Sequence, residues 1–247
     1  MLNSLASGWK SIGHMVPIQR DSGRSSWSRR AVAFLGRQRL VWRAAAFAKS
    51  RMRTRRERFV RLEANARRRS RRIDGIRLAR RPETEAMAQL VARLGYDGRI
   101  RHVRDAQYFA WRFRNPLHEY RFLYAGERAL DGYLVLQRYR AGSDAARVHI
   151  SDWEAVDTRT RETLLEAAVT WGEFEQLRTW TASLAEGDRK ILHRAGFVER
   201  PGSSPAGWDR VLVRSLRAAE GAEWALADRP LLDLPSWDLR MLYAMSG

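Results

Sequence analysis

The chain has 247 residues, which is enough for one large domain or for one medium domain with extensions. It contains no cysteine, which excludes disulfides, thiolate metal sites and cysteine nucleophiles and fits a reducing compartment. The net charge of +18 suggests a polyanionic partner, but residues 1–80 hold 22 Lys/Arg against four acids, whereas residues 81–247 hold 24 of each. No apolar run approaches the roughly 20 residues that are needed to span a bilayer. We expect a cytoplasmic protein, with peripheral attachment to a membrane as the alternative.

The basic N-terminal third divides into two segments. Residues 1–26 contain glycine and proline breakers and are predicted to be irregular. Residues 27–72 are predicted to be a basic helical linker, because apolar residues recur there at helical spacing among arginines. The arginines of residues 28–72 favour weak contact with an anionic membrane or with nucleic acid. A solvated helical linker is the alternative, since no recognised nucleic-acid motif accompanies them.

From residue 73 onward the chain alternates between strand and helix patterns. The helix predicted over 82–95 has proline and acids in its first turn and glycine at its end, and the helix over 105–113 stops before Asn115-Pro116. The other predicted elements are strands over 73–80, 118–126, 129–139, 146–156, 177–183 and 208–216, and helices over 161–174 and 187–196.

This order predicts an α+β domain over residues 73–217, with a mixed central sheet flanked by helices. Residues 218–247 are predicted to be a C-terminal tail with a late strand over 233–243. No hydrolase, Walker or dinucleotide-binding signature occurs in the chain, so those function classes are disfavoured.

Two stretches of this domain resemble the GNAT superfamily of N-acetyltransferases. HRAGFVER (193–200) resembles the short helix running into Gly-Phe that closes GNAT domains. RDAQYFAWRFRNPLHEYRFLYA (104–125), followed by DGYLVLQ (131–137), resembles a subgroup from bacterial polysaccharide and capsule gene sets. The resemblance implies N-acyl transfer from acetyl-CoA to an amine acceptor, such as an amino sugar of a surface polysaccharide.

The same subgroup often carries two such domains in tandem. NSLASGWKSIGHMVPIQR (3–20) resembles the last strands of a first domain, in which a Gly-Trp turn leads into the closing strand. The resemblance therefore implies that residues 1–26 are a remnant of a preceding, truncated GNAT domain.

The resemblance also places a CoA site at the start of the helix that follows the strand 146–156. A helix N-terminus favours the pyrophosphate there, and the family usually adds a glycine-rich loop. The matching segment EAVDTRTRETLLEAA (154–168) has no glycine. The candidate contacts are Val156, Arg159 and Arg161, with Thr158 or Thr160 capping the helix. An exposed helix start with solvated arginines is the alternative.

Acyl transfer needs a general base near the acceptor amine and a proton donor for the leaving thiolate. Asp152 and Glu154, at the end of the strand 146–156, are the candidate bases. The family's donor is a tyrosine, but the matching residue is Leu192. The neighbouring His193 is a weak substitute, because one residue along a helix turns a side chain by about 100°. These departures leave a second reading open, in which the domain is a catalytically inactive structural or binding module.

The resemblance also bears on the aromatic stretch at residues 104–116. Its aromatic residues pair at helical spacings, Tyr108 with Trp111 and Phe109 with Phe113. We expect Phe109 and Phe113 to lie in the core. The GNAT order places this helix beside the acceptor, so Tyr108, Trp111 and Arg112 are the candidate residues for an acceptor pocket.

Overall fold

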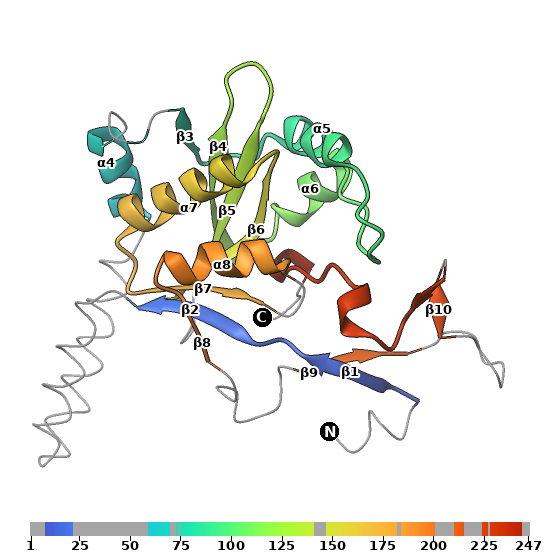
Figure 1. Cartoon of the computed structure of the whole chain (residues 1–247). Coiled ribbons are helices and arrows are strands. Elements are labelled where there is room, and N and C mark those ends of the chain that lie inside the picture. Colours follow the sequence, from blue (N-terminus) through green and yellow to red (C-terminus); the bar gives the residue numbers. More distant parts are fainter. Residues whose placement is uncertain are drawn as a thin grey trace, which may run out of the picture.

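The computed structural model describes residues 8–21, 59–69, 73, 75–140, 147–181, 184–200, 210–214, 224–226 and 228–243. A seven-stranded mixed sheet organises the molecule (Figure 1). In spatial order its strands are β3 (Ile76–Ala79), β4 (His118–Ala125), β5 (Gly132–Tyr139), β6 (Arg147–Ala155), β7 (Gln176–Trp180), β2 (Pro17–Asp21) and β8 (Val198–Glu199). Neighbouring strands are antiparallel except β6 and β7, which are parallel. The α+β class with a mixed central sheet is therefore confirmed.

The helices lie where the hydrophobic periodicity predicts them. In chain order they are α5 (Thr84–Leu94), α6 (Ala106–Arg112), α7 (Thr158–Gly172) and α8 (Glu186–Arg194). Because α7 links two parallel neighbours, β6-α7-β7 is the crossover unit of the sheet. The predicted strand over 208–216 forms as β9 (Arg210–Val213), but it lies outside the main sheet.

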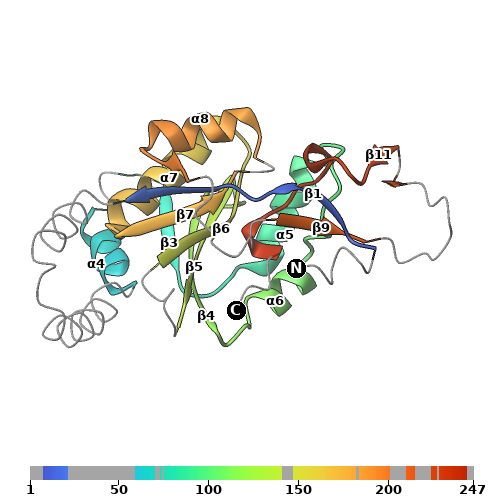
Figure 2. The same cartoon turned by 90° about the horizontal axis from the view of Figure 1, so that it is seen from below.

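Two hydrophobic cores cover the two faces of the sheet. On one face, Leu123, Leu134 and Leu136 pack with residues of α7 and α8 and with Leu62 of a further helix, α4 (Val60–Arg69). On the other face, aromatic residues of β4 and β5 pack against α5 and α6. The alternation of strand side chains between the faces produces this division. Figure 2 shows α7 and α8 on one side of the strands and α6 on the other.

The described part of residues 1–26 forms two strands, so the prediction of irregular backbone is wrong there. β1 (Lys10–His14) pairs with β9 in a separate ribbon, and β2 lies between β7 and β8 in the main sheet. The expected breakers occupy positions that a strand tolerates. Gly13, at φ +148°, lies at a register shift, and Pro17 is the first residue of β2.

Helix α4 belongs to the sheet domain, although the sequence assigns it to the linker 27–72. Phe59 and Leu62 are fully buried in the core on the α7 side, and the Asn65 side chain donates to the carbonyl of Trp171 at 2.9 Å. The packed domain therefore includes chain N-terminal to residue 73. Residues 27–58, on which most of the predicted membrane or nucleic-acid contact rests, lie outside the described residues.

The described part of the C-terminal region contains no long strand, so the late strand predicted over 233–243 is wrong. It forms the short pair β10 (Ala225–Leu226) and β11 (Arg229–Pro230), then the 3-10 turns η3 (Leu234–Ser236) and η4 (Met241–Tyr243). Pro235 lacks a backbone donor, and a single parallel bridge joins Trp237 to Ile100. Among the described residues, no helix is both long and apolar enough to cross a membrane.

Candidate functional site

Two acidic residues of β6 point into the interior of the protein. Asp152 and Glu154 are 3% and 6% exposed and lie at alternate positions, so they share the face that carries α5 and α6. Tyr133 lies opposite Glu154 on β5. The register between β5 and β6 shifts just before Asp152, which marks a bulge at this point of β6. Buried carboxylates require partners, because an unpaired buried charge is costly.

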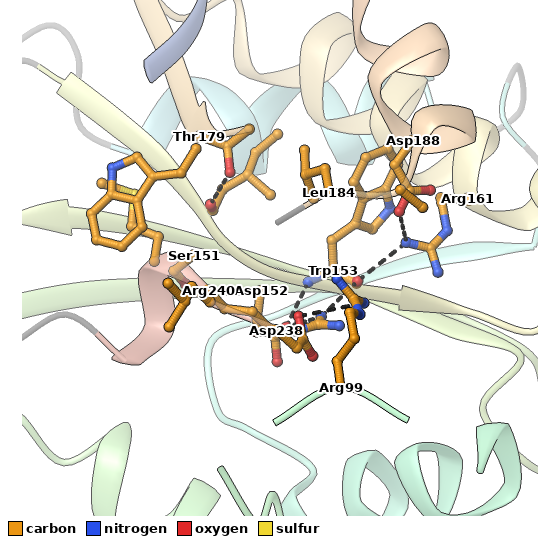
Figure 3. A pocket seen from close by; sticks show the side chains of 15 residues that line it. Arg99, Ser151, Asp152, Trp153, Arg161, Thr179, Leu184, Asp188, Asp238 and Arg240 are labelled. Carbon is orange, nitrogen blue, oxygen red and sulfur yellow. Dashed lines mark hydrogen bonds and ion pairs between the residues drawn. The ribbon is translucent and has the colours of Figure 1, made fainter. Parts of the chain in front are cut away.

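Two arginines each pair with both carboxylates. Arg104, in the loop before α6, lies 3.3 Å from Asp152 and 2.7 Å from Glu154. Arg240, in the C-terminal region, lies 2.7 Å from each of the same carboxylates. The Tyr133 hydroxyl also donates to Asp152 at 2.7 Å. Figure 3 shows Arg240 beside Asp152 and Asp238.

The network fixes the charge state of Glu154. Burial alone would raise the pKa of this carboxyl, but Arg240, Arg104 and Arg161 outweigh burial and lower its pKa well below the usual range. The same burial raises the pKa of the Tyr133 hydroxyl. Glu154 is thus an ion-paired carboxylate at neutral pH. A carboxylate held by arginines is a weak base, which makes it a poor group for taking a proton from an amine.

The C-terminal residues 238–243, which we call the cleft segment, cover the predicted acceptor side. Leu242 is fully buried among the residues that pack on α5 and α6, and Arg112 donates to its carbonyl. The Tyr243 ring lies 6.3 Å from that of Tyr108. Two of the three predicted acceptor residues therefore contact the protein's own chain. The third, Trp111, is 60% exposed.

The prediction that Phe109 and Phe113, in and just after α6, lie in the core holds in part. Phe109 is fully buried, whereas Phe113 is partly buried and packs against the same core. Their rings stack at 5.8 Å, as residues four apart on a helix do.

A narrow cleft separates β6 from β7. The two strands pair from Arg147 to His149 only, and beyond this point Ser151 and Trp153 on β6 face Trp180 on β7 across a cleft. The cleft segment contributes Leu239, Arg240 and Met241 to its lining. The open volume that remains is about 40 Å³, which is room for only a few water molecules.

Helix α7 begins at an acidic cap. The side chain of Asp157 accepts from the backbone N–H of Thr160 at 2.7 Å, so the expected caps Thr158 and Thr160 are wrong. The helix starts three residues earlier than predicted, and Asp157 takes the capping position. A carboxylate thus occupies the end of the helix where a phosphate would otherwise bind.

The structure divides the predicted pyrophosphate residues between a buried network and the surface. Arg161 lies 3.3 Å from Glu154 and 3.2 Å from Asp188, with its guanidinium 5.3 Å from the Trp153 ring centre. Val156, Thr158 and Arg159 are exposed at the surface. The residues present therefore fit acetyl-CoA only in part, because Arg161 is held by two acids whereas Arg159 is exposed at the start of α7.

Leu192 stands at the family's donor position, and His193 is the weak substitute beside it. Leu192 is fully buried in the core and carries no proton to give. His193 is half exposed, and its Nδ1 lies 3.2 Å from the carbonyl of Phe197 at the end of the same helix. It is a helix-end residue rather than a member of the buried network.

Sequence reasoning missed Arg104, Asp238 and Arg240. One signal was available: acids two residues apart within an apolar strand share a buried face and demand cationic partners. That pattern predicts a cationic partner but does not say which residue it is, because Arg240 lies 88 residues from Asp152 in the sequence.

Among the described residues, no group of three or more His, Asp or Glu side chains is arranged to hold a metal ion. Comparison of the chain with protein-family models, with curated proteins and with solved structures finds no match. The site is therefore interpreted from its own geometry.

Proposed function

We propose that this chain is a GNAT-like domain that acts as a structural or binding module, with its own C-terminal chain in the place of the acceptor. One observation carries the proposal: Arg240 pairs with both candidate bases, Asp152 and Glu154, at 2.7 Å. The group that would have to accept a proton from an incoming amine is already bound to a permanent cation.

Energetics favour a cleft segment that stays in place. Removing one partner from a buried ion pair costs about 3–5 kcal/mol, because the other charge is left buried and uncompensated. Leu242 would also lose its burial. The backbone N–H of Asp238 donates to the carbonyl of Ile100 at 2.8 Å, which fixes the start of the segment. The cleft segment therefore has the contacts of a packed part of the domain rather than those of a loop that opens readily.

The cofactor side supports the same proposal. Asp157 places a negative charge at the start of α7, and Arg161 is held by Glu154 and Asp188. The open volume of about 40 Å³ leaves no room for a pantetheine arm while the cleft segment is present. Acetyl-CoA would have to displace buried charges in order to enter.

A second candidate function is N-acyl transfer from acetyl-CoA to an amino sugar. The observation in its favour is that β6 and β7 pair only at their first residues, as a CoA cleft between parallel strands requires. Arg159 is exposed at the start of α7 and is the remaining cation for a pyrophosphate. In this case the cleft segment must leave before substrates bind.

A thiol-release assay separates the two candidates. The chain is mixed with acetyl-CoA and glucosamine, and free CoA is detected with a thiol reagent; the protein gives no background because it has no cysteine. We expect no release above the buffer rate and no heat of binding at about 1 mM acetyl-CoA, the range of the weakest specific ligands. Saturable release that is lost in Arg159→Ala would overturn the proposal, while release unchanged by that substitution indicates a contaminating enzyme.

We propose a cytoplasmic location, because a chain without cysteine fits a reducing compartment. Contact of residues 28–72 with an anionic membrane or nucleic acid stays a prediction from charge, since the structure describes only residues 59–69 of that segment.

A further inference from the structure

Helix α4 turns a basic side away from the domain. The helix contains four arginines and a single acid, Glu63. Arg61, Arg67 and Arg68 are exposed, and because successive residues turn by about 100° around a helix, all three lie away from the buried Leu62. In the part of the chain that the structure describes, none of these three guanidiniums is paired with a carboxylate. We call these three residues the arginine face.

The one acid of α4 does not neutralise the arginine face. Glu63 is held by Arg80 and Arg121, and hydrogen bonds from these two arginines lower the pKa of its carboxyl despite partial burial. Arg77 of β3 is paired in turn with Glu83. Arg77 and Arg80 therefore add no free positive charge beside α4, and the surplus rests on the arginine face alone.

The apolar side of α4 is already used by the domain. Phe59 and Leu62 are fully buried, and Ala66 packs against the same core. A basic amphipathic helix binds a bilayer by placing its apolar side among the lipids, and α4 cannot offer that side without leaving the core. The helix also contains no aromatic residue on which a nucleic-acid base could stack. What α4 offers a partner is therefore contact between guanidiniums and phosphates.

We propose that the arginine face of α4 binds the phosphate backbone of double-stranded nucleic acid without reading its sequence. Arg61 and Arg68 are two helical turns apart, so their Cα atoms lie about 10 Å from each other on one side of the helix. A duplex carries one negative charge per about 1.7 Å of its axis, which puts phosphates within reach of both guanidiniums. Guanidiniums bind phosphates through paired hydrogen bonds. The proposal names a partner for the proposed module but does not depend on whether the cleft at β6 transfers acyl groups.

The test measures the fluorescence anisotropy of a labelled DNA duplex of about 20 base pairs, titrated with the full chain between about 50 and 200 mM NaCl. Arg61→Gln and Arg68→Gln should each weaken binding about fivefold near 100 mM salt and reduce the slope of log K against log salt by about 0.9, the value of one phosphate contact. Arg114→Gln is the matched control. It removes the same charge from an exposed position just after α6, which covers the other face of the sheet, so the slope should not change. Thermal melts confirm that the variants fold.

Two further probes separate backbone contact from its alternatives. A second duplex of unrelated sequence should bind within about twofold of the first, because phosphate contacts carry no sequence information. Vesicles with about 30% phosphatidylserine test the membrane alternative. The proposal is overturned if the duplex does not bind at about 100 μM chain in low salt, or if Arg114→Gln lowers the slope as much as the two α4 variants do. It is also overturned if Arg61→Gln and Arg68→Gln release the vesicles but leave the DNA slope unchanged, which would assign the face to an anionic membrane.

Discussion

Replacing Arg240 by methionine is the perturbation that probes the buried network most sharply. Methionine keeps much of the side-chain length but removes the guanidinium shared by Asp152 and Glu154. Breaking a buried ion pair on one side costs about 3–5 kcal/mol. Two facts place the expected loss near the lower limit: Arg240 is 17% exposed, and Arg104 still contacts both carboxylates. We therefore expect the free energy of unfolding to fall by about 3 kcal/mol.

Urea denaturation of the intact chain measures this loss, and thermal melting gives an independent value. At about 2–4 °C per kcal/mol for a protein of this size, the melting temperature should fall by roughly 6–12 °C. Arg194→Met is the control, because it removes an exposed ion pair with Glu162 and should cost less than about 1 kcal/mol. A loss below about 1 kcal/mol for Arg240→Met would show instead that the buried carboxylates do not depend on the cleft segment.

Three further predictions concern pH, core packing and one turn. Burial, with nearby arginines, lowers the pKa of His118 to about 4 and of His149 to about 3, below the unfolded value of about 6.5. The free energy of unfolding that the two neutral histidines contribute is complete above pH 6.5. It is lost as the pH falls toward 4, because the unfolded chain then binds more protons than the folded chain. Urea denaturation at several pH values in this window should show that His149→Gln reduces the slope of unfolding free energy against pH by about 1.4 kcal/mol per pH unit. Phe109→Ala should cost about 3–5 kcal/mol in urea denaturation and Trp111→Ala less than about 0.5, and comparable losses would contradict the burial difference. Gly126→Ala should destabilise by more than about 1 kcal/mol in the same assay, because Gly126 has φ +101° and an added Cβ would lie 2.1 Å from the carbonyl oxygen of Ala129; a neutral effect would contradict that geometry.

Local sequence patterns predicted the elements of the sheet domain well. Strand alternation and helical periodicity are properties of neighbouring residues, so α5, α7 and the strands β4 to β7 could be located within a few residues. The position of Asp152 and Glu154 near the end of β6 follows from the same alternation. The partial burial of Phe113 and the exposure of Trp111 depend on what packs against α6, which its own spacing does not show.

The misses share one physical cause, which is pairing across long stretches of chain. β2 is a five-residue strand that begins with proline, and its pairing with β7 and β8, together with the burial of Ile18, stabilises it. Residues 233–243 were predicted to form a strand, yet the backbone of Trp237 and Asp238 is fixed by Ile100 instead. Periodicity carries no information about either contact, so the closure of the candidate site could not be predicted.

Hydrogen exchange at the backbone amide of Asp238 reports whether the cleft segment is a fixed part of the domain. This N–H donates to the carbonyl of Ile100 at 2.8 Å and anchors the cleft segment. If the segment is a fixed part of the domain, the amide should exchange slowly, at a rate close to that of Leu134 in β5, and acetyl-CoA should leave the rate unchanged. Fast exchange in the free protein, or loss of protection when acetyl-CoA is added, would contradict the account and show that the segment opens for a substrate.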